Sequence, residues 1–246
     1  MKRLAALLLA CCAAIGQQRN FVACPIVRDT KTVPCFLAEF EGELYYLGIQ
    51  QDIVAEFHPP QLKHEVLVEG RVAPGPRVCG GIPLQPLSIS VNKEVNLACN
   101  VLLPAEPGIE APLAARGAGP SSRRAAGPAV TKEPLSGKQE FTVPYAFNDD
   151  YLEFAASGIV TEAAAYAKRI RASSIDVVGY RAATLLTNGQ TLTEKAGLAE
   201  KRAQNIATLL RGSGISNVNV TFKSDADAAD GQTDPSRRRV RITIIP

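Results

Sequence analysis

Apolar and polar residues alternate along much of the N-terminal part of the chain, which is the pattern of strands with one buried face. The stretch FLAEFEGELYYLGI alternates on both sides of Glu41 and Gly42, which predicts a hairpin. HEVLVEGRV predicts a strand ending at Gly70, and LSISV predicts another after two prolines. Short strands with few helical stretches predict an all-β domain over residues 19–103, a small barrel of OB-like type.

From residue 139 onwards the spacing of apolar residues alternates between strand and helix periods, which predicts an α+β domain over residues 139–246. A first strand at 141–147 is followed by a turn at 148–150. The apolar face of the first predicted helix consists of Ile159, Ala163, Ala167 and Ile170. That of the second consists of Ala199, Ala203, Ile206 and Leu210. SIDVVGY, VNVTF and RRRVRITII predict three further strands, so the order is β-α-β-α-β-β.

Two shorter patterns bound the second predicted helix. Thr191 and Glu194 have the spacing of a capping box ahead of it, and Gly212 is placed to end it.

The segment between the two predicted domains, residues 104–138, is rich in Pro, Ala, Gly and Ser and has few large apolar side chains. Such a composition does not offset the entropy lost on ordering, so it predicts a linker. Its arginines are expected to be solvated, and contact with anionic lipid or polymer is the alternative.

The first residues, MKRLAALLLACC, have a basic start and a short apolar run, which predicts a signal peptide over residues 1–16. The run is much shorter than the ~20 apolar residues of a spanning helix. LLAC resembles a bacterial lipobox, in which Cys11 is lipidated and becomes the mature N-terminus. AIG before Gln17 fits ordinary cleavage instead. Both readings predict export.

Four further cysteines, Cys24, Cys35, Cys79 and Cys99, lie in the predicted β domain. An even number in an exported chain predicts two disulfides. Proximity along the chain favours Cys24–Cys35 and Cys79–Cys99 among the three possible pairings, and free buried thiols are the alternative. A zinc site is not expected, because the cysteines form no C-x-x-C pair and the histidines have no matching spacing.

Net charge and missing motifs narrow the range of expected functions further. A formal net charge of +3 is too small to indicate a nucleic-acid partner, and the arginine run before the last strand reads as one face of an edge strand. The chain shows no nucleophile motif, metal cluster or phosphate loop, so we expect neither catalysis nor a cofactor.

Four stretches of the C-terminal region, FNDDYL, IDVVGY, LAEKRAQNIATLLRGSGI and SRRRVRITI, together resemble the OmpA-like periplasmic domain. Their order and spacing carry the resemblance, which covers the C-terminal region only. The family binds peptidoglycan in the envelope of Gram-negative bacteria. The resemblance therefore implies a periplasmic protein with peptidoglycan as partner, attached to the outer membrane if Cys11 is lipidated.

The resemblance also implies a binding site for a diaminopimelate side chain. The family's carboxylate-binding arginine falls on Arg202, and its Gly-His-Thr-Asp loop falls on Gly179, Tyr180, Arg181 and Ala182. Asn148 in FNDDYL and Arg238 in SRRRV complete the implied site.

Ala182 takes the place of the family's ammonium-binding Asp. Losing one member of a buried charge pair costs ~2–5 kcal/mol, so binding should weaken about a hundredfold or more unless another acid substitutes. The candidate acids are Asp149, Asp150, Asp225, Asp227, Asp230 and Asp234. Two alternatives stay open: Arg181 joins Arg202 to favour a purely anionic ligand, or Arg202 is an ordinary solvated helix residue.

Two functions are thus expected to compete. The first is a non-catalytic envelope protein that associates with peptidoglycan, with weakened affinity. The second is an envelope binding or scaffold module that has lost this recognition and binds a ligand or protein through its N-terminal β domain.

Overall fold

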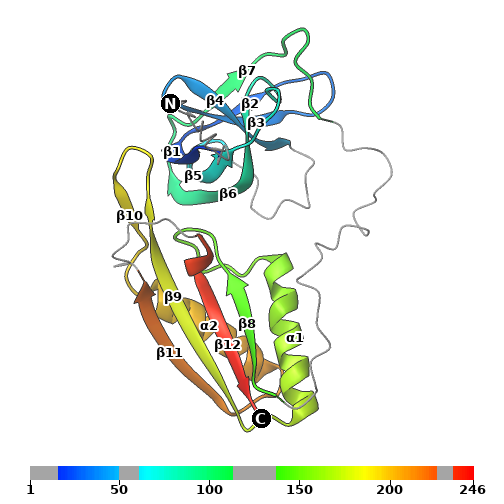
Figure 1. The fold of residues 1–246 in the computed structure, drawn as a ribbon, viewed down its shortest axis with the longest axis vertical. Coiled ribbons are helices and arrows are strands. Elements are labelled where there is room, and N and C mark those ends of the chain that lie inside the picture. The colour runs from blue at the N-terminus through cyan, green and yellow to red at the C-terminus, as the bar shows by residue number, and fades with distance from the viewer. Residues whose placement is uncertain (1–15, 50–60, 113–136, 226–234) are drawn as a thin grey trace, which may run out of the picture.

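A computed structural model describes residues 16–49, 61–112, 137–225 and 235–246. The predicted signal segment, including Cys11, lies outside the described residues, as does most of the predicted linker. The described chain forms two sheets, one N-terminal and one C-terminal, and the N-terminal sheet lies beyond one end of the C-terminal strands (Figure 1). None of the helices in the described part of the chain is long and apolar enough to cross a membrane.

The N-terminal residues form a seven-stranded sheet in the order β1-β5-β6-β4-β3-β2-β7. Its strands are β1 (Gln18–Ala23), β2 (Pro25–Arg28), β3 (Cys35–Phe40), β4 (Glu43–Ile49), β5 (His64–Val72), β6 (Ile82–Val95) and β7 (Val101–Leu103). The predicted hairpin is confirmed as β3–β4, and Glu41 and Gly42 both adopt the positive φ that its tight turn requires.

The N-terminal sheet is strongly curled. The start of the long strand β6 pairs with β4 and the rest pairs with β5. The curl brings β1 against β3, so that the rings of Phe21 and Phe40 stack with centroids 4.6 Å apart. Within the described residues the two edge strands, β1 and β7, do not pair with each other. The predicted small OB-like barrel is therefore not confirmed, and the sheet is a curled, open one.

Two disulfides hold the N-terminal sheet, as predicted, but the pairing favoured by proximity was wrong. The bonds are Cys24–Cys99 and Cys35–Cys79. Position in the sheet decides the pairing: Cys24 precedes β2 and Cys99 precedes β7, and these two strands are parallel neighbours. Neighbours in a sheet need not be neighbours in sequence, so spacing alone misleads.

The first part of the predicted linker, residues 104–112, lies against the N-terminal sheet. Ala111 is buried there, and the Glu106 carboxylate pairs with the buried Arg28 at 3.3 Å. The Cys79 sulfur also contacts the Glu110 carbonyl at 3.7 Å.

The C-terminal residues form a five-stranded sheet in the order β10-β9-β12-β8, with β11 parallel to β9. The elements are β8 (Gln139–Pro144), α1 (Phe154–Ile170), β9 (Ser174–Leu185), β10 (Thr191–Thr193), α2 (Leu198–Gly212), β11 (Val218–Asp225), the short helix η1 (Pro235–Arg237) and β12 (Arg239–Ile245). The predicted order is confirmed, with β10 added. β9 and β10 form a hairpin that reaches the N-terminal sheet (Figure 1).

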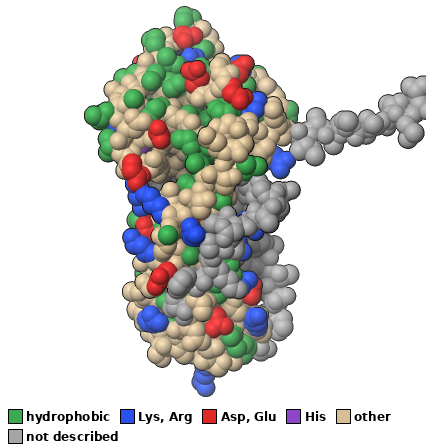
Figure 2. Space-filling model, turned by 90° about the vertical axis from the view of Figure 1, so that its left-hand side faces the viewer, with side chains coloured by type: hydrophobic (Ala, Val, Ile, Leu, Met, Phe, Trp, Pro, Cys, Tyr) green, Lys and Arg blue, Asp and Glu red, His purple; other side chains and the backbone are tan. Residues whose placement is uncertain are grey.

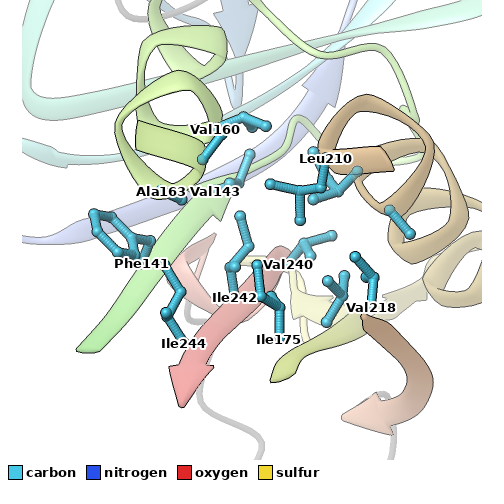
Figure 3. Close-up of a cluster of buried hydrophobic side chains, with 14 of the residues drawn as sticks. Phe141, Val143, Val160, Ala163, Ile175, Leu210, Val218, Val240, Ile242 and Ile244 are labelled. Atoms are coloured by element: carbon cyan, nitrogen blue, oxygen red, sulfur yellow. The ribbon is translucent and has the colours of Figure 1, made fainter. Parts of the chain in front are cut away.

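The core of the C-terminal domain lies between its sheet and its two helices (Figure 3). Alternate residues of the strands point into it, and the predicted stripes of α1 and α2 meet them. Its fully buried members include Val143, Ala163, Ile175, Ala203, Ile206, Leu210, Val240, Ile242 and Ile244. The strand and helix periods of the sequence thus locate this core correctly.

Candidate functional site: an arginine pocket filled by internal carboxylates

The candidate residues from separate parts of the chain meet at the end of the C-terminal sheet that faces the N-terminal sheet. Gly179 lies where β9 passes under the start of α2, and a Cβ added there would lie 1.9 Å from the Ala199 carbonyl oxygen. Only glycine permits this approach, which places Arg202 of α2 against Tyr180 in the middle of β9.

Arg202 is completely buried, and each of its five N–H donors has an acceptor. Its Nε donates to the Asp149 carbonyl at 2.7 Å, while Nη1 and Nη2 donate to the carbonyls of Tyr180 and Ala146 at 3.1 and 2.9 Å. The two remaining donors bind the Glu194 carboxylate, at 3.0 Å to Oε2 and 2.7 Å to Oε1. The alternative that Arg202 is an ordinary solvated helix residue is therefore wrong.

Glu194 completes the pocket from inside the chain. Its side chain is fully buried, and its two oxygens form a bidentate fork with Arg202. The same oxygens accept hydrogen bonds from the backbone N–H of Asn148 at 3.0 Å and of Ala182 at 2.8 Å. Four donors thus bind this carboxylate, and the charge of Arg202 is neutralised without an outside ligand.

The predicted capping box at Thr191 and Glu194 was wrong. The helix α2 begins at Leu198 with Gly197 at its N-cap, and Thr191 lies in β10. The physical reason is that Glu194 gains more from a buried guanidinium and two buried N–H groups than from an exposed helix end. Sequence reasoning assigned Glu194 a local role and missed its role in the site.

The other candidates support Glu194 rather than surround an open cavity. Asn148 has a positive φ of 56° and accepts a hydrogen bond from the Lys195 N–H through its side-chain oxygen, at 2.8 Å. Arg181 donates to the Glu194 carbonyl at 2.8 Å. Arg181 and Arg202 therefore both contact Glu194, one at its backbone and one at its carboxylate.

Tyr180 contributes its backbone to the site and directs its side chain elsewhere. Its carbonyl accepts from Arg202, whereas its buried ring lies beneath the guanidinium of Arg239, 4.4 Å from the ring centroid. Arg241 lies 5.7 Å from the same centroid. Arg239 and Arg241 therefore share one face of β12, as predicted. The prediction of an edge strand was wrong, because β12 lies between β8 and β9 and pairs with both.

Of the candidate replacement acids, Asp149 and Asp150 do not reach Arg202 with their side chains. The Asp149 carboxylate pairs with Lys93 at 2.7 Å, and Asp150 pairs with Lys201 at 2.9 Å. The hydrogen bond from Lys201, reinforced by Lys93, holds the pKa of Asp150 below its usual value. Asp227, Asp230 and Asp234 lie outside the described residues. Asp225 of β11 stands opposite Ala182 in the parallel pairing of β9 and β11, and its side chain lies outside the described part of the structure.

Arg238 forms a second filled site beside the first. Its side chain is 1% exposed, and both of its Nη atoms bind the Glu69 carboxylate of β5, in the N-terminal sheet. Nη1 also donates to Thr184 Oγ1 at 3.0 Å, and this hydroxyl donates to Glu69 at 2.9 Å. Sequence reasoning missed Glu69 and Thr184, because nothing in their local pattern distinguishes them from other strand residues.

Burial also affects the aromatic side chain beside the site. The Arg202 guanidinium lies 4.8 Å from the ring centroid of Tyr145. Desolvation raises the pKa of the Tyr145 hydroxyl well above its usual value, so this group stays neutral. Within the described residues, no group of three or more His, Cys, Asp or Glu side chains is placed to hold a metal ion.

The C-terminal part of the chain is similar to solved OmpA-like structures. The OmpA-like domain of FopA1 from Francisella tularensis subsp. tularensis SCHU S4 is 20% identical, with 44% of this chain and 73% of that one covered and a TM-score of 0.36. The cell wall anchor of the T6SS from Pseudomonas aeruginosa is 18% identical, with 44% and 81% covered and a TM-score of 0.33.

An outer membrane protein from Borrelia burgdorferi B31 is 20% identical, with 47% of this chain and 95% of that one covered and a TM-score of 0.30. No protein-family model and no curated protein matches the chain. At these identities and TM-scores, a function has to rest on the residues of this chain.

Proposed function

We propose that the chain is a non-catalytic cell-envelope module with an OmpA-like C-terminal domain, in which an internal carboxylate replaces peptidoglycan as the ligand of Arg202. The observation that carries this proposal is the buried fork between Glu194 and Arg202, at 2.7 and 3.0 Å.

The fork argues against binding of a diaminopimelate head group. A ligand carboxylate would have to displace Glu194, and breaking a buried ion pair by removing one partner typically costs about 3–5 kcal/mol. The ligand ammonium would gain nothing in return from Ala182, which has no charge. Together these two features make the filled pocket the more stable state.

Export to the envelope has separate support. The chain begins with a basic and then apolar stretch, and its N-terminal sheet carries two disulfides, which persist in oxidising compartments. We propose a periplasmic location. We also propose attachment to the outer membrane through a lipid on Cys11. In this view the N-terminal domain carries the ligand or protein binding.

The acids of the site are already engaged, which supports a non-catalytic role. Glu194 and Glu69 are paired with arginines, and Asp149 and Asp150 are paired with lysines. A general acid or base needs to exchange protons with a substrate, and these pairings already occupy the carboxylates.

The second candidate is association with peptidoglycan at weakened affinity. It is favoured by Arg202 itself, which keeps the position and the bidentate geometry that a ligand carboxylate needs. A weak contact would still tether the protein when a lipid anchor raises its effective concentration.

Co-sedimentation of the full chain with purified sacculi separates the two candidates. The unchanged chain and the matched variants Arg202→Ala and Arg211→Ala, both on α2, are compared after folding has been checked. We expect none of the three to pellet with sacculi. Saturable binding that Arg202→Ala abolishes and Arg211→Ala preserves would contradict the proposal and establish the second candidate.

A further inference from the structure

The N-terminal domain covers the end of the C-terminal domain where the candidate site lies. At the centre of this contact, Glu69 of β5 reaches Arg238 and Thr184. The three residues are 3%, 1% and 0% exposed, so the contact between the domains excludes water from an ion pair. A carboxylate placed this way occupies the guanidinium as an outside anion would.

Neutral hydrogen bonds surround the central ion pair. The N–H of Phe147 donates to Ser90 Oγ of β6 at 2.8 Å. At the tip of the β9–β10 hairpin, the N–H of Thr187 donates to the Asn20 carbonyl at 2.7 Å, and the N–H of Asn20 donates to Thr187 Oγ1 at 2.9 Å. Both Ser90 and Asn20 are buried, which places them within the contact rather than at its edge.

Charged pairs form the rim of the contact. Lys93 of β6 pairs with Asp149 at 2.7 Å, and Glu94 pairs with Lys195 at 2.5 Å. Figure 2 shows acidic and basic side chains next to one another where the upper, N-terminal part meets the lower part. A water-free centre with a charged rim is the arrangement of a specific interface.

The contact between the domains is polar, and the hydrophobic cores stay separate. The C-terminal core and the two N-terminal clusters share no residue. Parting the domains would therefore leave each core intact and return the charged and hydrogen-bonding groups of the contact to water. Polar interfaces of this kind open more readily than hydrophobic ones.

We propose that the N-terminal domain is a reversible cap on the candidate site and that the Glu69–Arg238 pair is its latch. Partners outside the chain reach the Arg202 end of the C-terminal domain only when the domains part. The cap goes beyond the proposed function, because it does not depend on what the site binds.

Thiol labelling of the full chain tests the cap. Ser90→Cys places a reactive group at a 3% exposed position whose side chain contacts Phe147 across the domain contact, in a background of Cys11→Ser and Cys12→Ser. We expect slow labelling by a maleimide. Adding Glu69→Ala leaves Arg238 buried without its partner, so labelling should accelerate on the order of a hundredfold. Adding Glu94→Gln at the rim should change the rate by less than about fivefold.

An engineered disulfide between the two domains, called the lock, completes the experiment. Asn20→Cys with Thr187→Cys, oxidised to a disulfide across the contact, should restore slow labelling in the Glu69→Ala chain. Fast labelling before any change to Glu69, or labelling that Glu69→Ala leaves unchanged, would overturn the cap. Accelerated labelling that the lock fails to reverse would also overturn it, because it would trace to local unfolding of β6. Sacculus binding has no part in these readouts, so the cap and the proposed function fail separately.

Discussion

Arg202 and Arg238 are the two largest fully buried side chains in the described part of the chain, and each forms a bidentate fork with a glutamate. The partners differ in origin. Glu194 lies 8 residues from Arg202, in the same domain, whereas Glu69 lies 169 residues from Arg238, in the other domain. The first fork lies within the C-terminal domain, and the second connects the two domains.

The two forks have different consequences when they break, although their contacts are similar. If the Arg202 fork is broken, the remaining charge stays buried inside one domain. If the Arg238 fork is broken, the domains can part and both charges regain water. We therefore expect Arg202 to control the stability of a domain and Arg238 to control docking.

The largest expected effect is that of Arg202→Ala. This change removes five hydrogen bonds and leaves the Glu194 carboxylate buried without its partner. The free energy of unfolding of the C-terminal domain should fall by about 3–5 kcal/mol. Urea denaturation measures it, with Arg211→Ala as a control that should cost much less. Equal costs for both variants would show that the fork has no special role.

Glu69→Ala should instead change the cooperativity of unfolding. In the unchanged chain the docked domains are expected to unfold in one calorimetric transition. Without the latch the heat should divide into two transitions, each close to the stability of one domain, because Arg238 regains water when the domains part. A single transition shifted to lower temperature would mean that the pair stabilises a domain rather than the contact.

A smaller loss of stability is expected from Gly179→Ala, which tests how Gly179 positions Arg202. In Gly179→Ala the new methyl group would overlap the Ala199 carbonyl, so α2 has to shift and the fork has to distort. Overpacking of this kind costs typically about 1–3 kcal/mol. Gly158→Ala is the matched control, because it lies in α1 with open space around it and should stabilise by about 0.5–1 kcal/mol. Thermal or urea unfolding of both variants measures the contrast.

The smallest expected effect is the pH dependence of the rim. Hydrogen bonds from Lys201 and Lys195 hold the pKa values of Asp150 and Glu94 below 3.8 and 4.5 respectively. A carboxyl group with a lowered folded pKa contributes stability above its unfolded pKa and loses it as the pH falls through the folded pKa. The ion pairs of Asp150 and Glu94 should therefore weaken only at a pH below the usual pKa range of carboxyl groups.

The stability contributed by Lys93 depends on pH in the opposite direction, because it is lost at alkaline rather than acid pH. Its hydrogen bond to Asp149 raises its pKa above 10.5, so its contribution is full at neutral pH and is lost as the pH rises through the raised pKa. Labelling of the Ser90→Cys chain should therefore stay constant across neutral pH after correction for thiol ionisation. A marked change between about pH 6 and pH 8 would point to groups other than the rim.

The periodic parts of the fold were predictable because their cause is local. Alternating residues located the β3–β4 hairpin, and helical spacing located the buried faces of α1 and α2. The candidate positions Gly179 and Arg202 also came from the sequence, through a resemblance. The disulfide pairing and the closure of the N-terminal sheet were not predictable, because they depend on which strands become neighbours.

By itself, the sequence determined the strands, the helices, the number of disulfides and the identity of the central arginine. These follow from periodicity, from cysteine count and from motifs a few residues long. The tertiary structure alone decided what fills the site. Whether Arg202 meets a ligand or Glu194, and whether Arg238 meets water or Glu69, depends on which charges are brought together and shielded from water. The Coulomb attraction of an ion pair depends on the distance between its atoms in space, and partners 169 positions apart in the sequence leave no local trace of the pair.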